Sequence, residues 1–131
     1  MHQPLRLICR TDSLIANYRW LQSIARVQVG AAVKADAYGT GASGAVPALL
    51  KAGCRYFFVS TWWEAERLRS LIGNADLAVL HGCGPRDRGV ARLGIGRPVL
   101  NSVSQVARWR QEFSDLDCDV MVDTGMNRLG L

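Results

Sequence analysis

The chain consists of short apolar runs separated by longer segments in which apolar residues recur at a helical period. The apolar runs lie at 27–33, 55–60, 75–80, 97–100 and 118–122. Apolar residues follow one another in these runs without regular polar alternation, which is typical of strands covered on both faces. We therefore predict five buried strands.

Four further segments predict helices, because their apolar residues fall on one face of a helix of 3.6 residues per turn. Serine, threonine, asparagine and aspartate favour helix starts, and glycine favours helix ends. The predicted helices with their boundary residues are 14–25 after Thr11 or Asp12, 45–52 before Gly53, 62–72 before Gly73, and 103–110 after Asn101 or Ser102.

The regular succession of strand and helix predicts an α/β fold with a parallel sheet and right-handed crossovers. Periodicity alone leaves a doubly wound sheet and a barrel open. A dinucleotide-binding turn would need a third glycine after Gly82 and Gly84, or after Gly94 and Gly96. Asp87 and Val99 occupy those third positions, so the sequence argues against a dinucleotide site.

The size and composition favour one soluble domain. The chain has 131 residues, of which 49% are hydrophobic and 21% are charged. No apolar run approaches the roughly 20 residues that span a bilayer, so we expect no membrane segment. Residues 1–4 do not begin an export signal, and we expect a cytoplasmic protein.

The net charge of +5 does not indicate a nucleic-acid-binding protein. The arginines are scattered and alternate with acidic residues, whereas a nucleic-acid surface needs a clustered basic patch. The four cysteines lack the spacing of a zinc site, and we expect reduced, buried thiols and no metal. The cysteines are Cys9, Cys54, Cys83 and Cys118.

The segment 31–39, with the sequence AAVKADAYG, places Lys34 directly after an apolar strand. The carboxyl edge of a parallel barrel is where such folds place their chemistry. An amine among apolar residues is costly when charged, and a neutral amine is the nucleophile that attacks carbonyl groups. The residues themselves are equally compatible with a lysine that extends into solvent.

Two motifs resemble those of one enzyme family. The segment V-K-A-D-A-Y-G at 33–39 closely resembles the cofactor-lysine motif of alanine racemases, which use pyridoxal 5'-phosphate. The segment V-D-T-G-M-N-R-L-G at 122–130 resembles the second motif of that family, and the resemblance covers nearly the whole chain. It implies a partial (β/α)8 barrel with about the first five strands. Residues 1–131 would be the N-terminal part of the cofactor-binding barrel, without the barrel remainder and a C-terminal β domain.

The resemblance also implies roles for the matching residues. Lys34 would hold the cofactor covalently and act as one of two acid–base groups at the substrate Cα. Tyr38 would contact the cofactor phosphate, and Leu80 would lie near the cofactor ring. Arg128 would lie beside the cofactor's phenolic oxygen and bind the substrate carboxylate. The implied reaction interconverts L- and D-alanine for peptidoglycan, in an enzyme that is a homodimer when complete.

The chain departs from the family pattern at two positions. Thr40 stands where many members have histidine, and we expect an altered but working site. Met121 stands where many members have a lysine that orients the motif arginine, so the support of Arg128 is an open question. We expect Asp36 and Asp123 to hold loops and not to take part in catalysis.

The chain ends within the second motif, and we expect a partial racemase that is inactive alone. Two alternatives remain at this stage. One is a non-catalytic pyridoxal-phosphate carrier with the same barrel, against which the motif at 122–130 argues. The other is a structural remnant that folds with a partner chain.

Overall fold

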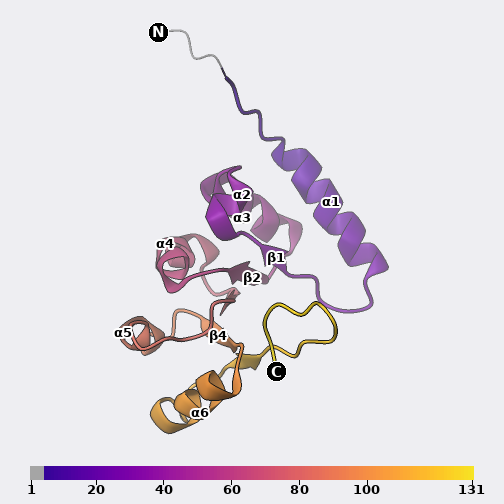
Figure 1. Cartoon of the computed structure of the whole chain (residues 1–131). Helices are drawn as coiled ribbons and strands as arrows, with labels where there is room; N and C mark the ends of the chain where they lie inside the picture. The colour runs from indigo at the N-terminus through magenta and orange to yellow at the C-terminus, as the bar shows by residue number, and fades with distance from the viewer. Residues whose placement is uncertain (1–4) are drawn as a thin grey trace.

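The computed structural model describes residues 5–131, so the prediction about an export signal at 1–4 lies outside the described residues. The described part of the chain folds into one α/β unit (Figure 1). No helix in it is long and apolar enough to cross a membrane. In chain order the elements are α1 (Thr11–Ile24), β1 (Ala31–Ala32), α2 (Lys34–Tyr38), α3 (Ala42–Ala52), β2 (Tyr56–Val59), α4 (Trp62–Ile72), β3 (Asp76–Val79), α5 (Arg88–Ala91), β4 (Arg97–Leu100), α6 (Val103–Glu112) and β5 (Asp119–Val120).

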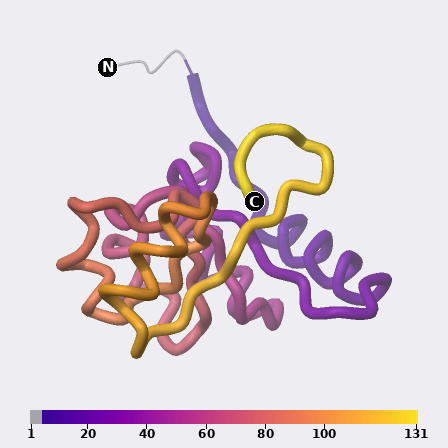
Figure 2. Tube along the Cα trace, turned by 60° about the horizontal axis from the view of Figure 1, so that its bottom comes forward, coloured from indigo at the N-terminus to yellow at the C-terminus, as the bar shows by residue number. Residues whose placement is uncertain are grey.

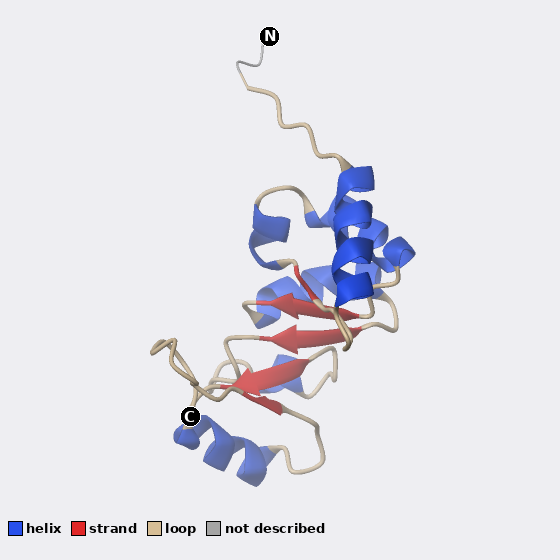
Figure 3. Ribbon diagram, turned by 90° about the vertical axis from the view of Figure 1, so that its right-hand side faces the viewer, coloured by secondary structure: helices blue, strands red, loops and turns tan. Residues whose placement is uncertain are grey.

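The strands form one parallel sheet in which their spatial order equals their order along the chain, β1-β2-β3-β4-β5. Each pair is parallel, with Phe57 beside Leu77 and Val99 beside Asp119. Figure 3 shows the arrowheads pointing the same way. A doubly wound sheet reverses its strand order at a switch point. The sequential order here has no such reversal and is that of a barrel.

The sheet curls, because residues on non-adjacent strands meet across its inner face. The hydroxyl of Tyr56 on β2 donates a hydrogen bond of 2.9 Å to Asp119 Oδ2 on β5. Strands β3 and β4 lie between them, so a flat sheet would separate these two strands by about 14 Å. Side chains stand roughly perpendicular to a sheet, so only curvature brings these two groups together. The expected partial barrel is therefore confirmed, and an open doubly wound sheet is excluded.

The outer face of the sheet packs under the helices and forms the core. Phe57, Val59 and Val79 are fully buried, and they pack with Ala65 and Ile72 of α4. Figure 1 shows α4 and α5 on the same side of the sheet. The inner face is less covered, and Tyr56 and Phe58 remain half-buried there. This difference between the faces positions the polar groups described below.

Three of the four predicted helices begin or end as their boundary residues predict. The helix α4 ends before Gly73 as predicted, and it starts with a capping box between Thr61 and Glu64 that was not predicted. The helix α6 starts at Ser102, whose side chain accepts from the Gln105 amide, and α3 ends at Gly53 with φ of 105°. The predicted cap of α1 is wrong: Thr11 and Asp12 lie inside its first turn, after Arg10, which provides no side-chain cap.

Other predictions need correction. The first and last strands are two residues long each, because β1 pairs with β2 alone and β5 with β4 alone among the described residues. Two helical segments, α2 and α5, were absent from the prediction. Cys54 and Cys83 are buried free thiols as expected, but Cys118 is only half-buried and Cys9 is exposed.

Candidate functional site

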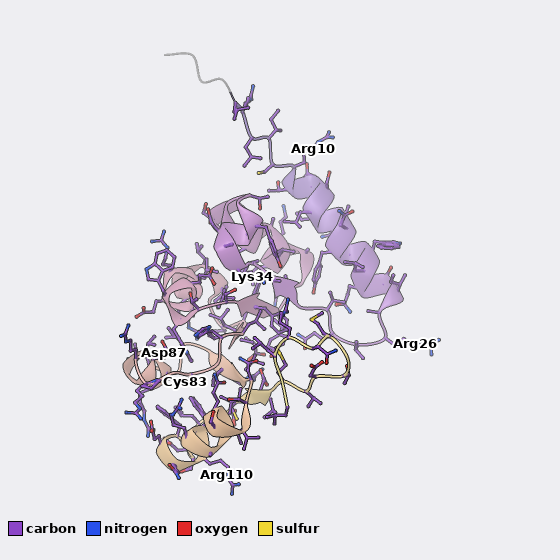
Figure 4. All side chains as sticks on the ribbon, viewed as in Figure 1. Arg10, Arg26, Lys34, Cys83, Asp87 and Arg110 are labelled. Atoms are coloured by element: carbon purple, nitrogen blue, oxygen red, sulfur yellow. The ribbon has the colours of Figure 1, made fainter. Side chains whose placement is uncertain are left out.

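Lys34 lies where β1 ends, at the carboxyl edge of the sheet (Figure 4). The preceding residue, Val33, is buried, and its amide donates 2.9 Å to the Phe58 carbonyl of β2. This bond extends the pairing of β1 and β2 up to the lysine. Lys34 itself is half-buried. A strand therefore fixes the backbone on one side of Lys34.

On the other side of Lys34 the chain makes a left-handed helical turn. Residues Ala35, Asp36, Ala37 and Tyr38 have φ between 50° and 56°. None of them is a glycine, and this conformation costs roughly 1–2 kcal/mol per residue. Gly39, with φ of 79°, ends the turn. Such a conformation persists only where surrounding contacts hold it.

Three side chains hold this turn. Asp36 Oδ1 accepts a 2.7 Å bond from the Ala42 amide at the start of α3. Thr40 Oγ1 donates 2.6 Å to the Ala37 carbonyl. Glu64 of α4 accepts 2.7 Å from the Ala35 amide. The predicted loop-holding role of Asp36 is confirmed, and Thr40 has a structural contact of its own.

The second motif forms a closed loop after β5, drawn in yellow in Figure 2. Asp123 Oδ1 accepts from the amides of Gly125 at 2.9 Å and Asn127 at 3.1 Å. These two bonds lower the pKa of the Asp123 carboxyl, the bond from Gly125 having the larger effect. The Asp123 amide donates to Leu131, whose own amide donates to Met121. The predicted loop-holding role of Asp123 is therefore confirmed.

Asn101 connects this loop to the middle of the sheet. The Gly130 amide donates 3.2 Å to the Asn101 carbonyl. The Asn101 side-chain amide donates 2.8 Å to the carbonyl of Leu80. Asn101 is buried, so both bonds are shielded from water. Backbone bonds and Asn101 thus hold the segment that contains Arg128.

A hollow of about 210 Å³ at the carboxyl edge brings the predicted residues Lys34, Leu80 and Arg128 together. They come from three separate segments of the chain. Tyr38 does not line this hollow: the residue is 64% exposed, and the centroid of its ring lies 5.8 Å from Lys34 Nζ. The lining residues are Lys34, Ser60, Leu80, His81, Met121, Arg128 and Leu129.

The lining chemistry suits an anionic ligand that carries a carbonyl group. Lys34 and Arg128 are cationic, and no lining residue is a carboxylate. A guanidinium presents fixed donors to carboxylate or phosphate oxygens. A primary amine is the side chain that condenses with an aldehyde. Leu80 and Met121 add apolar surface of the kind that a ring packs against.

A second polar cluster lies at the opposite edge, at the first residues of four strands. Arg97 of β4 lies 3.6 Å from Asp76 and 3.7 Å from Asp119, and its guanidinium carbon is 5.5 Å from the centroid of the Tyr56 ring. Burial raises the pKa of the Tyr56 hydroxyl. In parallel barrels the amino edge contributes stability, and the carboxyl edge contributes chemistry. The cluster is therefore structural.

Sequence reasoning missed several residues of the site. Ser60, His81 and Leu129 line the hollow, and none of them stands out in the sequence. Glu64 holds the turn after Lys34 from a helix 29 residues away in the chain. A glutamate at the third position of a helix indicates a capping box, but the local sequence does not predict the contact of Glu64 with Ala35.

A curled parallel sheet with a lysine-bearing hollow at its carboxyl edge defines part of a (β/α)8 enzyme barrel. Residues 9–131 match the family model described as "Alanine racemase, N-terminal domain". The chain belongs to this family. Its relatives include the alanine racemases of Acidiphilium cryptum, 46% identical over 91% of this chain and 34% of that one, and of Methylobacterium nodulans, 44% identical over 96% and 35%.

Solved structures agree with this assignment. The alanine racemase of Bartonella henselae, solved with covalently bound pyridoxal phosphate, superimposes with a TM-score of 0.81 and is 36% identical. The match covers 92% of this chain and 35% of that one. The biosynthetic alanine racemase of Pseudomonas aeruginosa has a TM-score of 0.74 and is 29% identical. The chain spans about a third of the length of the relatives it matches.

Proposed function

We propose that this chain forms the lysine-bearing part of a pyridoxal-phosphate-dependent alanine racemase. The single observation that supports the proposal is the hollow that contains Lys34, Leu80 and Arg128 together. Lys34 and Arg128 belong to two motifs almost a hundred positions apart in the sequence, and Leu80 lies between the motifs. Membership of the racemase family supports the same proposal.

The residues of the hollow suit pyridoxal phosphate. Lys34 would hold the cofactor aldehyde through its amine, Leu80 would pack against the ring, and Arg128 would lie beside the phenolic oxygen. Tyr38, exposed at the rim of the turn, would contact the phosphate. When bound, the cofactor supplies a conjugated ring that spreads the negative charge left on the substrate Cα.

Lys34 would then act as an acid–base group, and Arg128 would bind the substrate. The Lys34 amine removes or returns the Cα proton on one face of the substrate, which contributes on the order of 10²–10⁴ in rate. Arg128 remains charged and holds the substrate carboxylate with its fixed donors, which orients Cα toward the lysine. Racemisation needs a second acid–base group on the opposite face.

The open sheet edges support the need for further strands, from the same polypeptide or from another. Among residues 5–131, β1 and β5 each pair along one side only. Val120 of β5 and Val122, two residues later, have exposed apolar side chains. We propose L- and D-alanine as substrates, a homodimer as the complete enzyme and the cytoplasm as its location. This 131-residue chain alone has no racemase activity in our proposal.

Absorbance spectra of the purified chain with added pyridoxal phosphate test the cofactor site. We expect a new band near the visible edge that borohydride removes while fixing the cofactor on Lys34. The Lys34→Ala variant should lack this band. A band of equal strength in the variant would exclude Lys34 as the attachment point. Interconversion of alanine enantiomers by the chain alone would overturn the proposal that further strands are required.

A further inference from the structure

Glu64 connects the two strand ends that flank the hollow. Its Oε1 accepts 2.7 Å from the amide of Ala35, the residue after Lys34. Its Oε2 accepts a hydrogen bond of 2.7 Å from the Ser60 amide and one of 3.1 Å from the Thr61 amide, where β2 ends and α4 begins. One carboxylate therefore receives three backbone donors from two segments.

These contacts exceed what helix capping requires. In a capping box the glutamate side chain accepts from the amide of the cap residue, here Thr61. The bond to Ala35 uses the other oxygen and crosses 29 residues of sequence. Ala35 is also the first residue of the left-handed turn, with φ of 50°. The second oxygen thus acts on the backbone of the cofactor-lysine motif.

We propose that Glu64 is a positioning residue for Lys34, an inference that rests on the proposed function. Both segments that it joins contribute side chains to the hollow, Lys34 from one and Ser60 from the other. Hydrogen bonds to an ionised acceptor are stronger and shorter than neutral ones. The carboxylate sets the separation of the two strand ends and the direction in which Lys34 leaves the backbone.

The two lysines of the chain allow a direct test. Lys51 is exposed on α3 and reports the reaction of an ordinary surface amine. In the assay the purified chain reacts with pyridoxal phosphate and then borohydride. The lysine amine adds to the aldehyde carbon, a carbon–nitrogen double bond forms as water leaves, and borohydride supplies the hydride that reduces it. Peptide mass spectrometry then gives the ratio of label on Lys34 to label on Lys51.

The main variant is Glu64→Gln, which retains a helix-capping residue. Its amide has one acceptor oxygen, so it satisfies either Ala35 or the Ser60–Thr61 pair. Misplacing a reacting group by about 1 Å costs up to about 100-fold. We expect Glu64→Gln to lower the Lys34 to Lys51 ratio about tenfold, and Glu64→Ala to lower it by up to about 100-fold, since supporting residues of a site contribute in this range.

Two controls separate positioning from folding. Thr61→Ala removes the capping hydroxyl and leaves the Glu64 bridge in place, and Glu66→Gln changes a charge on the exposed face of α4. Both should retain the ratio of the unsubstituted chain. Circular dichroism should show the same helix content in Glu64→Gln and Thr61→Ala.

The outcomes distinguish this inference from the proposed function. A ratio near one in the unsubstituted chain would overturn the proposed cofactor lysine, and the inference with it. A high ratio that Glu64→Gln and Glu64→Ala leave unchanged would overturn the inference alone. A loss of equal size in Thr61→Ala and Glu64→Gln would assign the effect to helix capping and also overturn it. A loss in the Glu64 variants alone supports it.

Discussion

The Tyr56 hydroxyl donates a 2.9 Å hydrogen bond to Asp119, a residue 63 positions further along the chain. The bond crosses the concave face of the sheet from β2 to β5 and joins the cluster around Arg97. Each bond of this kind contributes about 0.5–1.5 kcal/mol, and bonds to charged groups contribute more. The cluster therefore fastens the curvature of the sheet at the edge opposite to the hollow.

We expect Tyr56→Phe to lower the free energy of unfolding by about 1–3 kcal/mol, because it removes a donor to a charged acceptor. The pKa of Tyr56 is raised by burial, so its stabilisation is present below its ordinary pKa of 10.0 and is lost as pH rises through the folded value. Urea titrations at increasing alkaline pH should show that the free energy of unfolding falls more steeply with pH in the parent chain than in Tyr56→Phe. Equal slopes would contradict this assignment.

The adjacent tryptophans of α4 should differ strongly in their contribution to stability. Trp62 is 3% exposed and its indole donates 2.8 Å to the Gly82 carbonyl, whereas Trp63 is 64% exposed. We expect Trp62→Ala to lower the free energy of unfolding by about 3–5 kcal/mol. Trp63→Ala serves as the matched control and should cost less than about 1 kcal/mol. Thermal or urea unfolding measures both, and similar losses would be inconsistent with the burial described.

Gly130 is required by the loop that contains Arg128. Its φ is 124°, and an added Cβ would lie 2.6 Å from the Asp123 amide nitrogen. We expect Gly130→Ala to open this loop, at a cost of roughly 1–3 kcal/mol for the strained backbone. Amide hydrogen exchange at 121–131 should accelerate.

Gly44 provides the control for that substitution, because it lies in α3 with open space around an added Cβ. Gly44→Ala should stabilise the chain by about 0.5–1 kcal/mol. If Gly130→Ala left exchange over 121–131 as slow as in the parent chain, the close approach between Gly130 and Asp123 would be disproved.

Acid should loosen the same loop through Asp123. The amides of Gly125 and Asn127 lower the pKa of this carboxyl below its ordinary value of 3.8. The stabilisation is therefore present above pH 3.8 and is lost as pH falls through the lower folded value. Nuclear magnetic resonance of the Gly125 and Asn127 amides should reveal this transition. Asp123→Asn has no ionisable group there and should lack it.

Local sequence predicted the strands more accurately in the middle of the chain than at its ends, although it missed the short helix α5. The helix 62–72 was predicted with its observed bounds because its apolar period and the following Gly73 are local features of one helix. The strands at 27–33 and 118–122 are shorter in the structure because each lies at a sheet edge with one neighbour. Their residues alone do not reveal the number of neighbours.

The sequence by itself determined the alternation of strand and helix and the two motifs around Lys34 and Arg128. It did so because helical period, apolar runs, caps and motif spacing are local properties of the chain. Periodicity left a barrel and an open sheet open, the resemblance of the two motifs implied the barrel, and the tertiary structure confirmed it through the contact of Tyr56 with Asp119. The tertiary structure alone decided that Lys34, Leu80 and Arg128 share one hollow, and that Glu64 holds the turn after Lys34. These features depend on contacts between residues far apart in the chain, which the curvature of the sheet creates and which no local pattern encodes.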